Sequence, residues 1–272
     1  MDKQYFIDKL EDMRDEKDVD LKKSREHWDN RASEFYEYTK DSGKNETIEF
    51  LSGFIDLKDK TVLDVGFGAG RYLKLLADEG AKLSGVELSG QMMEYAKKHC
   101  RENDIDVEKM ELLNLAWEDV DLDELSWRAG FDLVFAAMSP VLSSYRSIEK
   151  LIAASKHGVF FSTHVLIEED IMSRVYKDIK GEDYKEVKNR FIYLLNILYL
   201  DGYFPNVKIV SGKRELEFTV DELTDRYSRR IFSGRESKEE RARMKSIIRE
   251  YEADGKVIVN MNKKDALIYF EV

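Results

Sequence analysis

The stretch Asp64-Val65-Gly66-Phe67-Gly68-Ala69-Gly70 decides the fold, because it joins an apolar segment to a helical one through three glycines. The segment Thr61–Val65 is short and apolar, which is typical of a buried strand, and Arg71–Glu79 has the apolar spacing of a helix. Glycines in a strand-to-helix turn let the backbone approach a ligand closely and leave N–H groups free at the helix start. The stretch therefore predicts a ligand-binding turn of an α/β fold.

The alternation of strand and helix continues after this turn. The further segments that read as strands are Lys82–Leu88, Met110–Leu115, Phe131–Ala136 and Val159–His164. The segments that read as helices between them are Gln91–Cys100, Leu122–Arg128 and Ser147–Ser155. Five strands separated by helices predict a doubly wound parallel sheet, because parallel neighbours need a crossover connection.

The segments before the alternation are helical. The apolar residues of Tyr5–Tyr38 have the spacing of one or two amphipathic helices, and Asn45 is a candidate N-cap for a helix through Phe54. We expect the N-terminal segment, residues 1–44, to form part of a lid over the core, residues 45–165.

The segments after the alternation mix helices and strands. Glu168–Tyr203 reads as mostly helical, and two capping boxes predict helices over 220–230 and 238–252. Two β-segments remain, Val207–Phe218 and Val257–Val272, the second with a polar break at Asn262–Asp265. We expect one domain over 1–272, in which residues 166–272 supply lid helices and the final antiparallel strands. The predicted fold is α/β, with a doubly wound, mostly parallel seven-stranded sheet.

Composition restricts the partners. The chain of 272 residues has a net charge of −11 and no basic tail, which argues against a nucleic-acid surface. One cysteine, Cys100, and four scattered histidines offer no metal-ligand spacing. The longest apolar run, Phe191–Leu200, is shorter than the roughly 18 residues that span a bilayer, and the N-terminus has no secretory signal. We expect a cytoplasmic protein without a metal or a membrane anchor. The simplest role for the apolar run Phe191–Leu200 is a buried lid helix, and a dimer interface or an apolar acceptor pocket stays open as an alternative.

Spacing within the glycine stretch discriminates between nucleotide-binding folds. A dinucleotide fingerprint, G-x-G-x-x-G, would need glycine where this chain has Arg71. An acid, Glu87, ends the second predicted strand, where it can accept both hydroxyls of a ribose. The run Val62–Gly70 has the form V-L-D-x-G-x-G-x-G, and with Glu87 it resembles the class I S-adenosylmethionine-dependent methyltransferases, whose fold is Rossmann-like.

The resemblance implies S-adenosylmethionine as the cofactor and assigns residues to it. The methionine portion would be held by Asp64, Gly66, Phe67, Gly68 and Gly70. The adenosine portion would be held by Glu87 at the ribose, by Leu88 against the adenine, and by Trp117 and Glu118 after the third strand. The residues after the fourth strand, from Ala136 to Pro140, would line the methyl-transfer site.

Several candidate residues have two readings that the sequence leaves open. Tyr36 and Arg31 reach the cofactor carboxylate in one reading, and in the other Tyr36 packs its helix onto the sheet. Trp117 is either an adenine platform or a core aromatic. Ser139 holds an acceptor or shapes the turn before Pro140, and His164 orients or deprotonates an acceptor or is a hydrogen-bonded loop histidine.

The function expected from these observations is methyl transfer to a small-molecule acceptor by in-line displacement. Such a reaction depends mainly on alignment, because the donor is already activated. Two alternatives stay open: a cofactor-binding sensor or partner subunit without transfer activity, and a protein or nucleic-acid methyltransferase. The oligomeric state is also open, a homodimer included.

Overall fold

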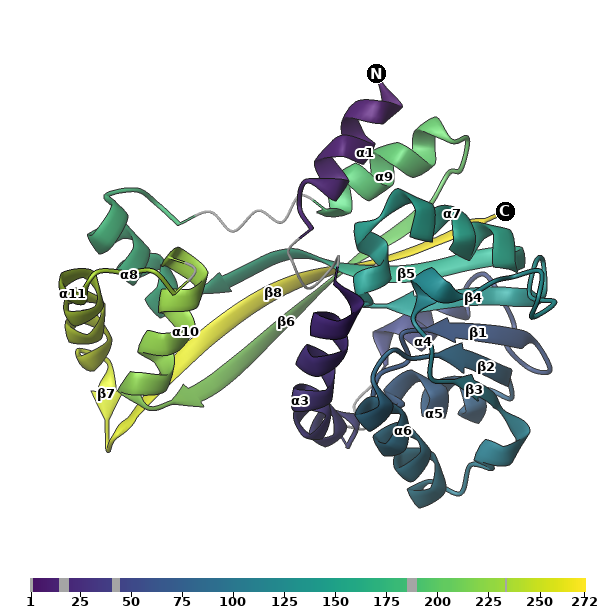
Figure 1. Ribbon diagram of the computed structural model, residues 1–272, viewed down its shortest axis with the longest axis horizontal. Helices are drawn as coiled ribbons and strands as arrows, with labels where there is room; N and C mark the ends of the chain where they lie inside the picture. The colour runs from purple at the N-terminus through teal and green to yellow at the C-terminus, as the bar shows by residue number, and fades with distance from the viewer. Residues whose placement is uncertain (1, 15–19, 41–44, 185–189, 233) are drawn as a thin grey trace. The chain divides into compact units, whose positions relative to one another are not determined.

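The computed structural model describes residues 2–14, 20–40, 45–184, 190–232 and 234–272 (Figure 1). The chain divides into two compact units. The first unit comprises Met1–Thr163, Asn189–Ile209 and Ala266–Val272, and the second comprises His164–Lys188 and Val210–Asp265. The expected partition into a single domain with lid and core stays a prediction.

A sheet with parallel strands contains the strands of the first unit and continues along strands that have residues in both units. Its order is β3 (Glu111–Leu113), β2 (Lys82–Val86), β1 (Thr61–Val65), β4 (Phe131–Ala137), β5 (Ser155–Glu169), β8 (Lys256–Glu271) and β6 (Asn206–Phe218). The pairs among β1 to β5 are all parallel, with Asp64 level with Gly85 of β2 and Phe135 of β4. The short strand β7 (Glu252–Ala253) pairs antiparallel with β8. The predicted α/β fold with a mostly parallel sheet is confirmed, and β7 adds an eighth strand to the seven expected.

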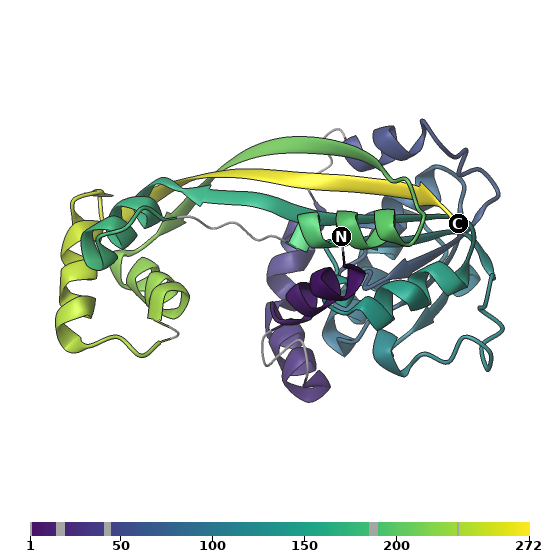
Figure 2. The same cartoon turned by 90° about the horizontal axis from the view of Figure 1, so that it is seen from above.

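Helices connect the parallel strands of the first unit. They are α5 (Arg71–Asp78), α6 (Gly90–Glu102) and α7 (Tyr145–Ala154), with short 3-10 turns at η1 (Val107–Lys109), η2 (Trp117–Asp119) and η3 (Pro140–Ser143). Upstream lie α1 (Lys3–Glu11), α3 (Leu21–Thr39) and α4 (Glu46–Leu51), and α9 (Arg190–Leu200) follows later in the chain. Helix α3 lies beside α6, and α1 lies beside α9 (Figures 1 and 2). Among the described residues, no helix combines the length and the apolarity needed to cross a bilayer.

Two expectations about single segments are wrong. Residues 122–128, expected as a helix, form turns, because Ser126 adopts a left-handed φ of 56° and ends the helical path after one turn. Residues 262–265, expected as a polar break, are continuous strand within β8. Their polar side chains fit the strand because Asn262 and Lys264 are exposed, whereas Asp265 is buried and bonded to His164 and Lys263.

Aromatic packing fixes the centre of the sheet in the first unit. Phe135 of β4 stacks on Phe160 of β5 with ring centroids 4.7 Å apart, and both side chains are fully buried. Leu63 of β1 and Leu133 of β4 are also fully buried. Each such side chain stabilises the fold by about 1.5–3 kcal/mol relative to its exposure to water, so the strand ends that carry the site rest on a rigid layer.

The second unit has its own apolar core and a buried ion cluster. Its helices are α8 (Asp170–Lys180), α10 (Val220–Phe232) and α11 (Lys238–Arg249), and they pack on the apolar side chains of Val257 and Val259. Glu169 at the end of β5 is fully buried and accepts hydrogen bonds from Arg226 at 2.8 Å and from Arg230 at 2.6 Å. This cluster ties α10 to the end of β5.

We predict that Glu169→Gln lowers the free energy of unfolding by about 2 kcal/mol, because the guanidiniums of Arg226 and Arg230 lose a charged acceptor. The loss is limited because both guanidiniums are partly exposed and can still bond water. Burial raises the pKa of Glu169 and the two arginines lower it, with a net result below the ordinary 4.5. The wild-type contribution is therefore present above about pH 4.5 and is lost as pH falls through the lower folded-state pKa.

Urea unfolding of the full chain, followed by circular dichroism at about pH 7 and about pH 4, tests this expectation. The matched control is Asp221→Asn, which breaks the exposed pair of Asp221 with Lys245 on α11 and should change stability little. Equal effects of the two substitutions at neutral pH would contradict the role given to the buried cluster.

Candidate functional site

The glycine turn between β1 and α5 has the geometry of a ligand cradle. Gly66, Gly68 and Gly70 have φ values of 77°, 55° and 89°, in a backbone region that residues other than glycine rarely adopt. A Cβ on Gly66 would stand 2.5 Å from the Ser139 Oγ, and a Cβ on Gly70 would stand 2.9 Å from the Ala96 Cα. Gly70 is the N-cap of α5 and provides no side-chain cap, so the helix start presents bare backbone N–H groups.

The Phe67 side chain packs the glycine turn against β2. Its ring is buried, and a Cβ on Gly85 of β2 would stand 2.7 Å from the Phe67 Cδ1. The Gly66 N–H also donates to the Val86 carbonyl at 2.8 Å. The turn is thus positioned by the neighbouring strand as well as by its own glycines.

Glu87 joins the glycine turn to the loop after β2. Its Oε2 accepts from the Gly68 N–H and its Oε1 from the Ser89 N–H, both at 2.9 Å. The carboxylate is buried; burial raises its pKa, amide hydrogen bonds lower it, and the net value lies above the ordinary 4.5. Each carboxylate oxygen has a second lone pair, so Glu87 can bond a ligand without releasing the turn. The adjacent Leu88 is half-buried and its carbonyl accepts from Arg25 and Asn114.

Asp64 is a buried acid with an unused acceptor. Its side chain is 1% exposed at the end of β1, and its Oδ2 has no hydrogen-bond partner within the described part of the chain. Burial and the nearby Glu87 carboxylate raise the pKa of Asp64 well above its ordinary value. A buried oxygen without a partner is costly, so a cationic or hydrogen-bond-donating ligand would be favoured here.

The carboxyl end of β4 is strained. Met138 has a φ of 53° and is 39% exposed, an uncommon conformation for a side chain of this size. Its N–H donates to the carbonyl and to the Oγ of Ser162 on β5, both at 3.1 Å. This turn leads to Ser139, whose buried Oγ has no partner among the described residues and faces the Gly66 position. Ala136, two residues before Met138, is fully buried within β4.

Two predicted residues on α3, Tyr36 and Arg31, have polar partners outside the glycine turn, although Tyr36 packs in a buried cluster with Ala69 of that turn. The Tyr36 hydroxyl donates to Glu102, and its ring stacks on Tyr95 at 4.9 Å, which packs α3 onto α6. Arg31 pairs with Glu34 on its own helix. The cofactor role proposed for these two residues stays a prediction.

Trp117 and Glu118 lie in η2, after β3. Trp117 is buried and its Nε1 donates to the Ser147 carbonyl at 3.2 Å, which binds the ring to the start of α7. Glu118 is exposed. Lys150 donates to the carbonyls of Trp117, Glu118 and Val120 and thereby fixes the path of this turn. An adenine contact by either residue is untested.

His164 opens the second unit and forms a pair with a buried acid. Its Nδ1 lies 2.7 Å from the Asp265 Oδ1, and the imidazole is 41% exposed. Lys263 also donates to Asp265, at 2.7 Å. A carboxylate at Nδ1 orients an imidazole so that Nε2 can act as a base. The role of His164 in the reaction stays a prediction.

Sequence reasoning missed the residues that hold the loop after β2. Asp29 on α3 accepts from the Ser89 hydroxyl and from the Gln91 N–H, and Asn114 donates to the carbonyls of Glu87 and Leu88. The sequence signal for Ser89 was its place just before the predicted helix Gln91–Cys100, because serine is a common N-cap, and Ser89 is the N-cap of α6. Asp29 had no such signal, because it is distant in sequence.

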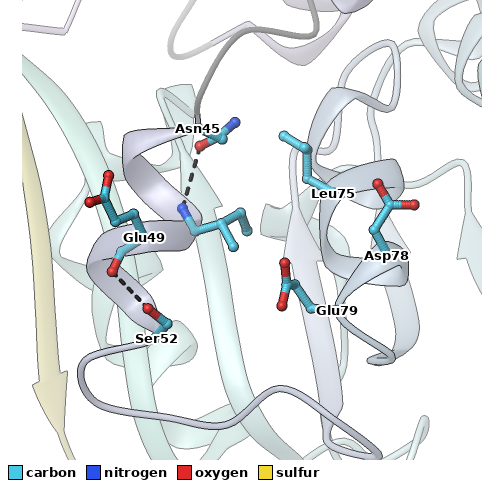
Figure 3. Close-up of a pocket in the computed structure, with 7 residues that line it drawn as sticks. Asn45, Glu49, Ser52, Leu75, Asp78 and Glu79 are labelled. Carbon is cyan, nitrogen blue, oxygen red and sulfur yellow. Dashed lines mark hydrogen bonds between the residues drawn. The ribbon is translucent and has the colours of Figure 1, made fainter.

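A surface pocket lies elsewhere, between α4 and α5 (Figure 3). Asn45, Glu49 and Ser52 line it from one helix, and Leu75, Asp78 and Glu79 line it from the end of α5. Ligands of open α/β sheets bind outside the carboxyl ends of the strands, which is where α5 begins, so this pocket is not the candidate site. Among the described residues, no group of three or more His, Cys, Asp or Glu side chains could hold a metal ion.

The donor set fits S-adenosylmethionine. A glycine cradle, a free oxygen on Asp64, spare lone pairs on Glu87 and free N–H groups at α5 complement a ligand that carries an ammonium, a carboxylate and a ribose. Asp64, Gly66–Gly70, Glu87 and Leu88 are therefore the residues that could hold this cofactor.

Comparison with known proteins matches the part of the chain that carries this geometry to a family. Residues 62–157 match the family described as a methyltransferase domain. A ubiquinone biosynthesis O-methyltransferase from Coxiella burnetii is 31% identical over 121 residues, which cover 43% of this chain and 48% of that enzyme, about half its length. An uncharacterized protein from Haemophilus influenzae is 26% identical over 90% of this chain and 88% of its own length.

Solved structures show the same fold. Magnesium protoporphyrin IX methyltransferase from Synechocystis, with bound S-adenosylhomocysteine, has a TM-score of 0.50 at 12% identity, over 91% of this chain and 98% of that one. The YcgJ protein from Bacillus subtilis also has a TM-score of 0.50, at 13% identity, over 83% of this chain and 97% of its own. The matched methyltransferase domain begins within β1 and includes the whole glycine turn, and these matches identify an S-adenosylmethionine-dependent methyltransferase.

Proposed function

We propose that this methyltransferase transfers the methyl group to a small-molecule acceptor. The observation that carries the proposal is the pair of buried oxygens without partners among the described residues, Asp64 Oδ2 and Ser139 Oγ, beside the Gly66 cradle. A cofactor and an acceptor bound there would supply the missing hydrogen bonds. The net charge of −11 and the relatives named for ubiquinone biosynthesis support a small molecule over a nucleic acid.

The residues of the first unit would divide the work of binding. Asp64 and the turn Gly66–Gly70 would hold the methionine portion, and Glu87 would hold the ribose hydroxyls with Leu88 beside the adenine. S-Adenosylmethionine supplies an activated methyl group on a sulfonium. The protein therefore contributes alignment, an effect worth up to about 7–11 kcal/mol in model reactions.

The Ser139 hydroxyl would orient the acceptor. Ser139 has its hydroxyl free to bond an acceptor atom, and the turn that carries it is held by Ser162. An oxygen acceptor is the first to test, because the ubiquinone biosynthesis relatives are O-methyltransferases.

We predict that Asp64→Asn and Glu87→Gln each weaken binding of S-adenosylmethionine by about tenfold or more, because charge-assisted hydrogen bonds are lost. Isothermal titration calorimetry with S-adenosylmethionine and S-adenosylhomocysteine measures the effect.

Asp132→Asn is the matched control, since Asp132 bonds the Thr61 N–H and hydroxyl at the opposite end of β1. It should leave the affinity unchanged. Wild-type affinity in both site variants, or no binding by the wild-type protein, would refute the assigned site.

We predict that Ser139→Ala lowers turnover at least tenfold and changes cofactor affinity less than about twofold, because its hydroxyl would act on the acceptor. Release of S-adenosylhomocysteine, measured with 3,4-dihydroxybenzoate and a panel of phenols and amines, tests the proposal. Turnover of a peptide or an oligonucleotide in place of every small molecule would contradict it, and cofactor binding without any turnover would favour a sensor.

A further inference from the structure

Asp29 on α3 lies at the end of a hydrogen-bond chain that leads to the glycine turn. The Ser89 hydroxyl donates to the Asp29 Oδ1, and the Ser89 N–H donates to the Glu87 Oε1 at 2.9 Å. The other oxygen of Glu87 accepts from the Gly68 N–H at 2.9 Å. Four residues from α3, the loop after β2 and the glycine turn are thus joined without a gap.

One oxygen of Asp29 serves the start of α6 as well. The Asp29 Oδ1 also accepts from the Gln91 N–H at 3.2 Å, while the Ser89 Oγ accepts from the Met92 N–H at 3.0 Å. Ser89 is fully buried, so its hydroxyl has no water with which to replace Asp29. Asp29 therefore holds the Ser89 hydroxyl and the first turn of α6, next to the Ser89 N–H that bonds Glu87.

Helix α3 touches the same region at two other points. Ala32 and Tyr36 of α3 pack in one buried cluster with Ala69 of the glycine turn and Met92 of α6. Arg25 donates from its Nε to the Leu88 carbonyl at 3.2 Å. Asp29 therefore acts from a helix that is packed in place, which makes a fixed hydrogen-bond acceptor.

The charges around Glu87 decide how Asp29 affects the protonation of Glu87. Asp64 on β1 and Asp29 on α3 are acids near it, and the Arg25 guanidinium, which donates to the Leu88 carbonyl, is a cation in the same region. Burial is the main cause that raises the pKa of Glu87, and the Asp29 charge raises it further. Asp29 thus favours the protonated form of Glu87 through its charge and orders Glu87 through Ser89.

We propose that Asp29 is a positioning residue for Glu87, through Ser89, in cofactor binding. The inference rests on the proposed function of Glu87 at the ribose. Asp29 touches neither the cofactor nor the reacting atoms in this assignment; it fixes the Glu87 carboxylate from α3.

The test compares Asp29→Ala with Asp29→Asn in the full-length protein. The asparagine variant keeps the one oxygen that both donors use and removes only the charge, whereas the alanine variant removes the acceptor. Glu37→Ala, which removes an exposed acid of α3 paired with Lys40, is the matched control. S-Adenosylmethionine affinity is measured by calorimetry, and the amide resonances of Gly68 and Ser89 are followed by NMR against pH without cofactor.

We expect Asp29→Ala to weaken S-adenosylmethionine binding about three- to tenfold, the loss typical of one or two hydrogen bonds. Asp29→Asn should bind within about twofold of wild type, and its Gly68 and Ser89 amides should titrate at a lower pH, because a like charge near Glu87 is gone. Glu37→Ala should match wild type in both measurements.

Wild-type affinity of Asp29→Ala for S-adenosylmethionine would overturn the inference. It would also be overturned if Asp29→Asn lost as much affinity as Asp29→Ala while the pH at which its Gly68 and Ser89 amides titrate stayed that of the wild-type protein. Failure of the wild-type protein to bind S-adenosylmethionine would instead overturn the proposed function. The amide titration still decides the link from Asp29 to Glu87 in that case, because it is recorded without cofactor. If the alanine variant does not fold, the asparagine variant and the titration decide.

Discussion

The bond between Glu87 and the Gly68 N–H is the interaction on which the site depends. Parallel pairing brings the ends of β1 and β2 to one edge of the sheet, with Val65 level with Val86. The carboxylate after β2 then fixes the glycine turn after β1, and its second oxygen fixes the loop that starts α6. Because one side chain orders both loops, the two halves of the assigned cofactor site are positioned together.

Burial makes this arrangement costly without a ligand. Asp64 and Glu87 lie near enough that the charge of Glu87 raises the pKa of Asp64, and neither acid has a cation partner in the pairs described for these residues. Two buried like charges disfavour ionisation of both. A ligand that brings a cationic group to Asp64 and hydroxyls to Glu87 relieves this cost, which is a physical reason for such a site to bind S-adenosylmethionine. The strained Met138 at the end of β4 stores energy at the same edge of the sheet.

Several element bounds and helix caps were predictable from the local sequence pattern. The bounds of β1 match the predicted Thr61–Val65, and Asn45 caps α4 as its position indicated, because strand ends and caps are set by residues adjacent in sequence. Residues 122–128 escaped prediction because their helical pattern is interrupted by the backbone of Ser126, which no side-chain periodicity reports. The strand character of residues 262–265 also escaped, since a buried Asp265 is accepted only where His164 and Lys263 pair with it.

The sequence by itself determined the class of fold and the position of the glycine turn, because strand and helix periods and glycine spacing are local properties. Tertiary structure alone decided which side chains meet: Asp29, Ser89 and Glu87 come together only once α3 packs beside α6. It also decided that the Tyr36 hydroxyl bonds Glu102 and that Trp117 bonds the Ser147 carbonyl. Hydrogen bonds between residues distant in the chain depend on packing, and a single sequence carries no local signal for them.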